Sequence, residues 1–233
     1  MTFRDKLIGT LRLLRPILEE PGVLVIGSEV PNLLQPDAAS TLVVSQDVDL
    51  GVPVDRVQAI KRRLREIEGL TPSADEPSVY VPASGALIEA NFLGLDSRIR
   101  EPGDTYVLED ADLPLMVFGP LGLLRAGVVV NVEDLHIPLP RLSDLMVEKL
   151  LTDRAGEKGA RDLLVVAGLL AVARVDDLDE FLSVACDLSA ESRHVICSSL
   201  TLLSLMDAHS EMPDPSSCRQ VITRLLTRIE GRT

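Results

Sequence analysis

The hexapeptide Ser45-Gln46-Asp47-Val48-Asp49-Leu50 places two aspartates two residues apart, directly after the apolar and hydroxyl residues 40–44. Successive side chains of a strand point to opposite faces, so Asp47 and Asp49 share one face and their apolar neighbours share the other. Two carboxylates on one face repel each other when no cation is bound. Oxygen ligands in this number suit magnesium, which proteins hold with one or two carboxylates plus phosphate oxygens. The alternative is a strand end that carries two solvated acids.

A glycine-serine pair precedes this strand. Val23-Leu24-Val25-Ile26 is a short apolar run typical of a buried strand, and Gly27 and Ser28 follow it at once, before a short predicted helix that ends near Leu34. Glycine lets a backbone approach a ligand closely, and the N–H groups at a helix start favour an anion. Gly27 and Ser28 are therefore candidate phosphate-binding residues, mainly because they lie one strand upstream of the paired aspartates.

A second predicted strand, residues 86–93, has polar side chains on one of its faces. The apolar Ala86, Ile88, Ala90 and Phe92 alternate with a face that includes Glu89 and Asn91. A carboxylate and an amide in the middle of a strand are costly to bury without partners, so they should face water, an ion or another polar group. Glu89 is the candidate for a third metal-facing acid, and Asn91 is its rival on the same face. An exposed sheet face is the alternative.

A basic helix is predicted between these strands, from Gly51 and Pro53 to about Glu68. Its buried stripe leaves five cationic side chains toward solvent: Arg56, Lys61, Arg62, Arg63 and Arg65. This cluster could contact a polynucleotide backbone, but a solvated helix face is the preferred interpretation.

Composition narrows the function classes. The 233 residues are 46% apolar and 25% charged, and the net charge of −13 argues against a general nucleic-acid coat protein, so no DNA partner is expected. Three cysteines and three histidines show no metal-ligand spacing, which predicts reduced thiols and an intracellular protein. The longest apolar run, from Leu163 to Ala173, is too short to cross a bilayer, and the start of the chain lacks an apolar signal region. A cytoplasmic location without a membrane partner is the expectation.

The hydrophobic period changes after Pro138-Leu139-Pro140. Before this point short apolar runs alternate with turns, and after it the pattern is helical, with Ser143, Ser189 and Ser216 as plausible helix starts. The sequence therefore predicts an α+β fold in which a mixed β-sheet flanked by helices (residues 1–140) precedes a C-terminal helical bundle (residues 141–233).

The order of these pieces resembles the nucleotidyltransferase superfamily that includes DNA polymerase beta. The similarity is closer to the abortive-infection, AbiE-type, toxin-like nucleotidyltransferases, in which a Thr-x-Asp-x-Asp-Leu strand is followed by a Lys-Leu pair and an Arg-Asp-Leu motif. The corresponding residues here are the hexapeptide at 45–50, then Lys149-Leu150, then Arg161-Asp162-Leu163. The chain departs from the family at Val43, where an Arg is usual, at Ser45, where Thr is usual, and at Asn91, where the third acid normally stands.

The resemblance implies a nucleotidyltransferase fold for residues 1–140 and transfer of a nucleoside monophosphate from a nucleoside triphosphate to an acceptor hydroxyl. Asp47, Asp49 and Glu89 would be the catalytic and metal-binding acids, and two Mg²⁺ ions would be expected between them. The resemblance also places Ser45 and Lys149 at the nucleotide, with Asp162 orienting Lys149 or the acceptor. An ordinary salt bridge between Lys149 and Asp162 is the alternative.

Three classes of function stay open from the sequence. The leading prediction is a magnesium-dependent nucleotidyltransferase whose acceptor is an RNA or a protein. The second is a catalytically degenerate relative that acts as a nucleotide-binding or protein-interaction module, which the absence of a third acid at Asn91 would favour. The third is a transferase for small cationic acceptors, which the acidic net charge permits.

Overall fold

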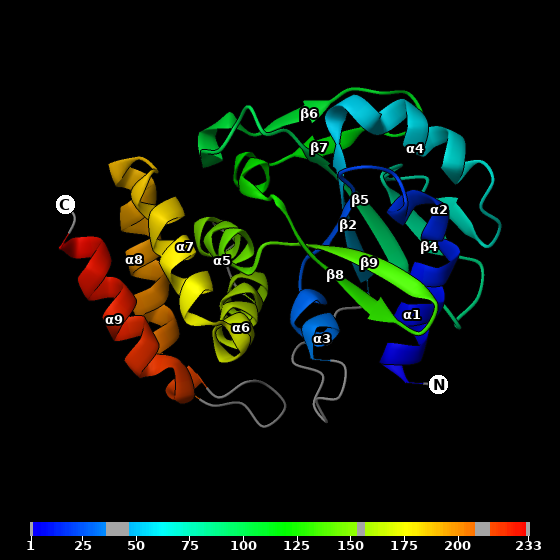
Figure 1. Cartoon of the computed structure of the whole chain (residues 1–233). Coiled ribbons are helices and arrows are strands. Elements are labelled where there is room, and N and C mark those ends of the chain that lie inside the picture. Colours follow the sequence, from blue (N-terminus) through cyan, green and yellow to red (C-terminus); the bar gives the residue numbers. More distant parts are fainter. Residues whose placement is uncertain (1, 36–46, 153–156, 208–214, 232–233) are drawn as a thin grey trace. The chain divides into compact units, whose positions relative to one another are not determined.

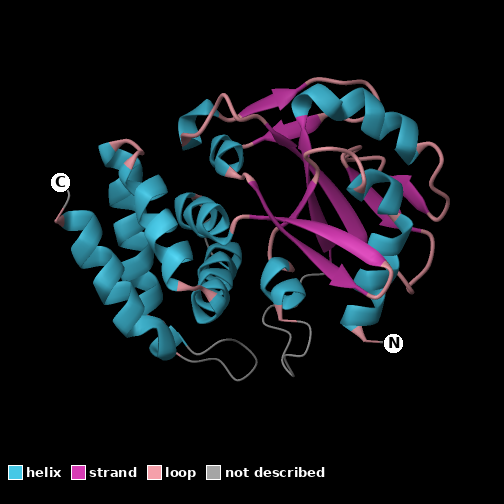
Figure 2. Cartoon of the chain, in the orientation of Figure 1, coloured by secondary structure: helices cyan, strands magenta, loops and turns pink. Residues whose placement is uncertain are grey.

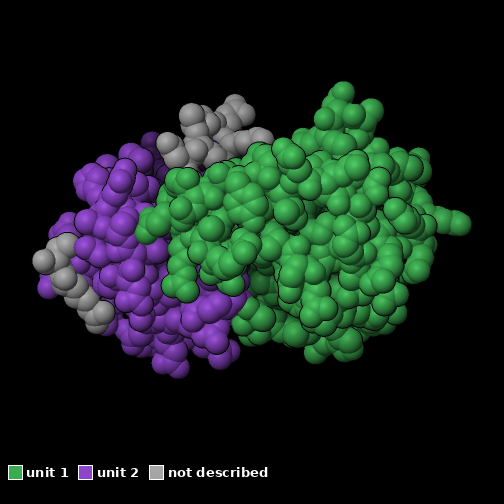
Figure 3. Space-filling view, turned by 90° about the horizontal axis from the view of Figure 1, so that it is seen from above, with its two compact units in different colours: residues 1–30, 44–122, 126–140 green, residues 31–43, 123–125, 141–233 purple. Residues whose placement is uncertain are grey.

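The computed structural model describes residues 2–35, 47–152, 157–207 and 215–231. The chain divides into two compact units, shown in different colours in Figure 3. Unit 1 consists of Met1–Val30, Val44–Gly122 and Ala126–Pro140, and unit 2 of Pro31–Val43, Leu123–Arg125 and Arg141–Thr233. Each unit is described by itself below. Whether residues 1–140 fold as a separate domain stays a prediction.

The main sheet of unit 1 is mixed. In the described residues it has seven strands, of which five follow the order β1-β2-β5-β4-β3, while β7 pairs with β5 and β6 pairs with β7. The β2–β5 and β5–β7 pairs are parallel and the others are antiparallel. The strands are β1 (Leu24–Ile26), β2 (Asp47–Pro53), β3 (Leu70–Pro72), β4 (Val79–Pro82), β5 (Glu89–Leu95), β6 (Tyr106–Leu108) and β7 (Leu115–Val117).

Short helices surround this sheet (Figure 1). Thr2 caps the first of them: its hydroxyl accepts a hydrogen bond from the Asp5 N–H, and the Asp5 carboxylate accepts one from the Thr2 N–H at 2.7 Å. The helices are α1 (Phe3–Leu13), α2 (Arg15–Leu18), α4 (Val57–Leu64) and the 3₁₀ turns η1 (Val54–Arg56), η2 (Pro102–Asp104) and η3 (Gly119–Leu123). A further helix, α3 (Val30–Leu34), begins in unit 1 and continues into unit 2.

The core of unit 1 is built on the two central strands. Val48, Leu50 and Val52 on β2 are fully buried, as are Ala90 and Phe92 on β5. The Phe92 ring meets the Tyr80 ring of β4 edge to face, with 5.3 Å between the ring centroids. The buried face of each strand is therefore the apolar face of the alternating pattern, and the polar residues of β2 and β5 point to the other side.

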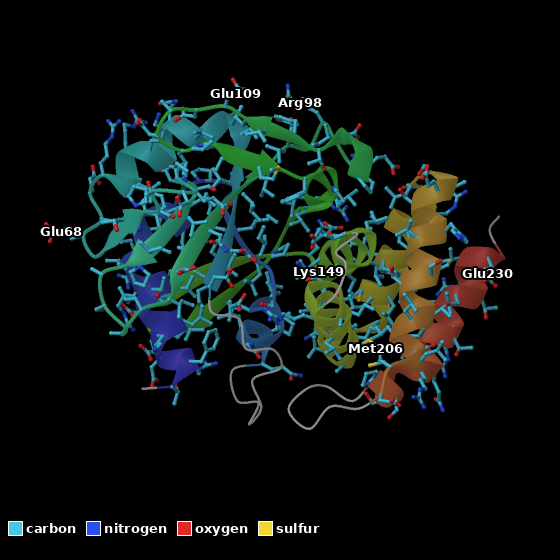
Figure 4. The ribbon with its side chains drawn as sticks, turned by 180° about the vertical axis from the view of Figure 1, so that it is seen from behind. Glu68, Arg98, Glu109, Lys149, Met206 and Glu230 are labelled. Atoms are coloured by element: carbon cyan, nitrogen blue, oxygen red, sulfur yellow. The ribbon has the colours of Figure 1, made fainter. Side chains whose placement is uncertain are left out.

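A buried carboxylate ties the end of β5 to β6. Asp96, which is 4% exposed, accepts hydrogen bonds from Arg98 Nε (2.8 Å), Arg98 Nη2 (2.7 Å) and the Tyr106 hydroxyl (2.8 Å). The Arg98 guanidinium holds the pKa of Asp96 well below its ordinary value. The Arg98 side chain is itself largely exposed at the surface (Figure 4). The charged, bidentate pair is thus buried at its Asp96 end and exposed at its Arg98 end.

Replacing this carboxylate is expected to destabilise unit 1. Asp96→Asn removes the charge and turns an amide N–H₂ toward donors, so the free energy of unfolding should fall by about 2–3 kcal/mol. Urea denaturation at neutral pH measures the change, and the exposed Asp75→Asn serves as the matched control. Equal stability of the two variants would contradict the structural role given to Asp96.

A two-stranded ribbon completes unit 1. It consists of β8 (Ala126–Val132) and β9 (Leu135–Pro140), paired antiparallel and joined by Glu133 and Asp134. Glu133 has a positive φ of 54°, the left-handed conformation that tight hairpin turns require. The alternate residues Leu135, Ile137 and Leu139 of β9 are buried, and β9 contacts β1, so the ribbon is anchored through β9.

Unit 2 is helical in its described part. Its main elements are α5 (Leu142–Leu151), α6 (Glu157–Val172), α7 (Val175–Cys186), α8 (Ala190–Leu205), η4 (Pro215–Cys218) and α9 (Arg219–Glu230). A polar network joins α5 to α7: the fully buried Asp144 accepts from Arg125 Nη2 at 2.6 Å, and the same guanidinium donates to Glu180 at 3.0 Å. Glu180 also accepts from the Ser143 hydroxyl at 2.9 Å.

The α+β fold class predicted from the sequence is confirmed. A mixed β-sheet with helices occupies the N-terminal part, and α5 to α9 form a helical C-terminal region (Figure 2). Of the helices in the described residues, none combines the length and the apolar character needed to span a membrane.

Candidate functional site

The two aspartates and the two polar residues of β5 lie on one face of the sheet. Asp47 is paired in register with Glu89, and Asp49 with Asn91, across the parallel β2–β5 ladder. Residues directly opposite each other on neighbouring strands point to the same side, so the four side chains form two cross-strand pairs. Parallel pairing of β2 with β5 therefore brings together residues that are 42 positions apart in the sequence.

Asn91 joins the two aspartates. Its Nδ2 atom donates to Asp47 Oδ2 at 2.6 Å and to Asp49 Oδ1 at 3.1 Å. All three side chains are partly buried at the beginning of their strands. An amide nitrogen between two carboxylates stabilises an arrangement that would otherwise be repulsive. Asn91 thus stands next to both acids, at the position where the family resemblance expects a third carboxylate.

The turn after β1 lies next to Asp49, because β1 flanks β2 on the edge opposite to β5. Ile26 is the register partner of Asp49 in the antiparallel β1–β2 pair, so the following Gly27 lies beside the Asp49 side chain. Gly27 has a φ of +100°, and a Cβ atom built on it would lie 2.5 Å from Asp49 Oδ2. Only glycine combines this backbone conformation with so close an approach. The Asp49 carboxylate is therefore seated directly against the glycine-serine turn.

Glu29 adds a carboxylate that the sequence analysis did not select. It is fully buried, and the Ser28 hydroxyl donates to its two oxygens, both at 3.1 Å. Burial, the nearby Asp49 carboxylate and, to a smaller extent, Asp47 raise the pKa of Glu29 from 4.5 to about 8. One signal was available in the sequence, because Glu29 is the only ionisable residue between Glu20 and Asp37.

The sequence predicted that Asp47, Asp49 and Glu89 would converge on a metal ion, but Asn91 and not Glu89 contacts the two aspartates. Glu89 opens β5 and is exposed, while Asn91 makes the contacts to both aspartates. In the described ranges, no three or more His, Cys, Asp or Glu side chains come together as a group that could hold a metal ion. Glu89 is the register partner of Asp47, but its side chain is exposed at the first position of β5, whereas Asn91 lies one pair further in and is partly buried.

Two of the remaining predicted nucleotide-binding residues, Lys149 and Asp162, belong to unit 2. Lys149 of α5 and Asp162 of α6 are both in unit 2 and form an ion pair, with 3.4 Å between Nζ and Oδ1 (Figure 4 labels Lys149). Lys149 Nζ is also 3.3 Å from Glu148 Oε2. This is the salt bridge that the sequence analysis left as the alternative, and a role for either residue at a nucleotide stays a prediction. Ser45 lies outside the described residues.

Three of the five cations predicted around helix α4 pair with acids of the same unit. Lys61 Nζ is 2.7 Å from Asp110 Oδ1 and 2.9 Å from Asp112 Oδ2. Arg63 pairs with Glu20 at 3.0 Å, and Arg65 pairs with Asp112 at 3.3 Å. Lys61 and two backbone N–H groups lower the pKa of Asp110 to about 2. These pairs support the interpretation of α4 as a solvated helix face and reduce its attraction for phosphates.

Comparisons with known proteins identify no family. No protein-family model matches the sequence, and no curated protein matches it either. Among solved structures, the crystal structure of JHP933 from Helicobacter pylori is similar at 13% sequence identity, over 97% of this chain and 90% of that chain. The TM-score is 0.34, so this likeness carries no argument about the site. The nucleotidyltransferase assignment stays a prediction from the sequence motifs.

Proposed function

We propose that unit 1 is a magnesium-dependent nucleotidyltransferase module. It would bind a nucleoside triphosphate and transfer the nucleoside monophosphate to an acceptor hydroxyl on an RNA, a protein or a small molecule. One observation carries the proposal: two aspartates on one strand face are held together by Asn91, and one of them, Asp49, lies against the Gly27 turn. A carboxylate pair beside a glycine-serine turn is what a magnesium-polyphosphate ligand requires.

The donor atoms present fit one magnesium ion. Asp47 and Asp49 supply carboxylate oxygens from adjacent positions of one strand face, and magnesium completes its coordination with phosphate oxygens and water. Asn91 could add its carbonyl oxygen after rotation of the amide, because the two ends of an amide have the same shape. A second ion would need a further carboxylate, for which the candidates are Glu29, whose pKa is raised by the nearby Asp49 and Asp47 charges, and Glu89, the register partner of Asp47.

Each group of residues would have its own role in nucleotidyl transfer. Gly27 and Ser28 would place backbone N–H groups at the triphosphate, and the buried Glu29 would hold Ser28 through its hydroxyl. Asp47 and Asp49 would hold the cation, because two carboxylates placed directly against a phosphate would repel it. The bound cation would supply charge stabilisation on the phosphate oxygens. The acceptor oxygen forms a bond to the α-phosphorus, the bond to the β-phosphate oxygen breaks, pyrophosphate leaves, and the hydroxyl proton passes to water.

A second candidate function is nucleotide binding without turnover. It is favoured by Asn91, because an amide replaces a charged ligand at the third position and donates to both aspartates. A neutral amide supports less positive charge at the site than a carboxylate does. The same ligand would then be bound as a signal or as a structural cofactor.

Binding and turnover measured on the same protein test both candidates. Calorimetry with Mg²⁺ and each of the four nucleoside triphosphates gives affinity, and α-labelled triphosphates incubated with total cellular RNA and protein give transfer. We expect binding that needs Mg²⁺ and that falls at least about tenfold in Asp47→Asn and in Asp49→Asn. Glu89→Gln, at an exposed position, is the comparison variant. It should leave the triphosphate affinity unchanged if Asn91 has replaced the third acid.

The outcomes separate the hypotheses. Binding with label transfer that both Asp variants lack supports the transferase. Binding without transfer supports the second candidate. Loss of binding in Glu89→Gln would restore the three-acid set predicted from the sequence. Two results would contradict the proposed function: the native chain binds no triphosphate, or both Asp variants bind it with unaltered affinity.

A further inference from the structure

The outer strand of the β8–β9 ribbon has an unusual composition for an exposed edge. β8 reads Ala126-Gly127-Val128-Val129-Val130-Asn131-Val132, seven residues without an ionisable side chain in a chain of net charge −13. Within the described residues β8 pairs with β9 and with no other strand. Val128 and Val129 are 54% and 56% exposed. A strand edge presents a row of backbone N–H and C=O groups, and proteins normally protect such edges with charges or proline.

Protection of this edge is incomplete. Prolines occur in the ribbon at 138 and 140, but both lie on β9, the strand that faces the body of unit 1. The register is irregular between Ala126 and Val129, and a bulge of this kind blunts the beginning of an edge. From Val129 to Val132 the pairing with β9 is regular. The valine-rich part of β8 is therefore a regularly paired, uncharged edge of high β-propensity.

The charged residues that flank β8 favour one orientation of a second strand paired with it. Arg125 precedes the strand and Glu133 follows it, and each is four residues from Val129. An antiparallel second copy of β8 centred on Val129 would place Arg125 of each chain beside Glu133 of the other. A parallel copy in register would place like charges together. Both side chains are accessible, at 49% exposure for Arg125 and 65% for Glu133, although each also pairs within its own chain, with Asp144 and Arg12 respectively.

We propose that β8 is a self-association edge, through which two copies of this chain pair antiparallel about a twofold axis near Val129. Val128 and Val129 of both copies are covered in the pair, and the backbone groups of the edge gain partners. The contact closes on itself, since each β8 edge is used once, so the product is a dimer and not a filament. This proposal does not depend on the proposed function.

Sedimentation velocity over a wide range of protein concentration tests the pairing. A contact of one strand per chain is small, so we expect a dissociation constant on the order of 10 µM. Val129→Lys places two ammonium groups at the twofold axis and should weaken association at least about tenfold. Val175→Lys is the matched control, because Val175 is another exposed valine, at 73% exposure, at the beginning of α7. Far-ultraviolet circular dichroism verifies that both variants are folded.

Cross-linking gives a second, geometric test. In an antiparallel pair the residues at the twofold axis have Cα atoms about 4.5–5.5 Å apart, within the range of a disulfide. Val129→Cys should therefore form a reducible dimer when diamide oxidises the two thiols, and Val175→Cys should not. A native chain that stays monomeric at high concentration overturns the proposal and leaves the edge to a strand of another protein. A dimer that survives in Val129→Lys and lacks the cross-link overturns it as well.

Discussion

Gly27→Ala is expected to lower the free energy of unfolding by about 2–4 kcal/mol and to abolish Mg²⁺-dependent nucleotide binding. The new Cβ atom would lie 2.5 Å from Asp49 Oδ2 and 3.2 Å from Asp49 Cβ and Cγ, so the aspartate side chain must move. The φ of +100° adds strain for any residue with a side chain. Urea denaturation and calorimetry with Mg²⁺ and a triphosphate measure the two effects on one preparation.

Variants at two other glycines separate the effect of backbone strain from the effect of the contact with Asp49. Gly22 also has a positive φ, +84°, but its added Cβ would meet Pro53 Cγ at 2.8 Å and not an aspartate. Gly22→Ala should therefore reduce stability and keep nucleotide binding. Gly85 has open space around its added Cβ, so Gly85→Ala should change stability by less than about 1 kcal/mol in either direction. Nucleotide affinity that is kept in Gly27→Ala would contradict the seating of Asp49 against the turn.

Glu29→Gln is expected to change how stability depends on pH. The pKa of Glu29 is raised from 4.5 to about 8 in the folded chain, so between these values the folded state retains a proton that the unfolded state releases. The free energy of unfolding of the native chain should therefore fall as pH rises from about 4.5 to about 8 and level off above it. Gln is neutral throughout, so the variant should lack this decline and exceed the native stability at pH 9 by about 5 kcal/mol.

Urea titrations at intervals from pH 5 to pH 9 measure this profile. The exposed Glu76→Gln is the control, and its profile should run parallel to that of the native chain. The Asp49 carboxylate is the largest charge effect on Glu29, so Asp49→Asn should move the declining part of the native profile to lower pH. Parallel profiles for Glu29→Gln and the native chain would show that Glu29 ionises normally in the fold.

Sequence patterns determined the parts of this protein that depend on local rules. Alternation predicts that Asp47 and Asp49 share a face of β2 and that Glu89 and Asn91 share a face of β5, because side chains of any strand alternate. The change from short apolar runs to a helical period near Pro140 predicts the order of sheet and helices, because each period reflects its own backbone geometry.

Only the tertiary structure decided which polar groups meet. The parallel register of β2 and β5 pairs Asp49 with Asn91 and leaves Glu89 at the exposed end of the strand. A shift of two residues would have paired Asp49 with Glu89 instead. No local pattern specifies that register, since it depends on packing across strands far apart in the chain. Burial of Glu29 is likewise a tertiary effect, because a carboxyl group next to a serine acquires its raised pKa only when the fold removes water and brings Asp49 near.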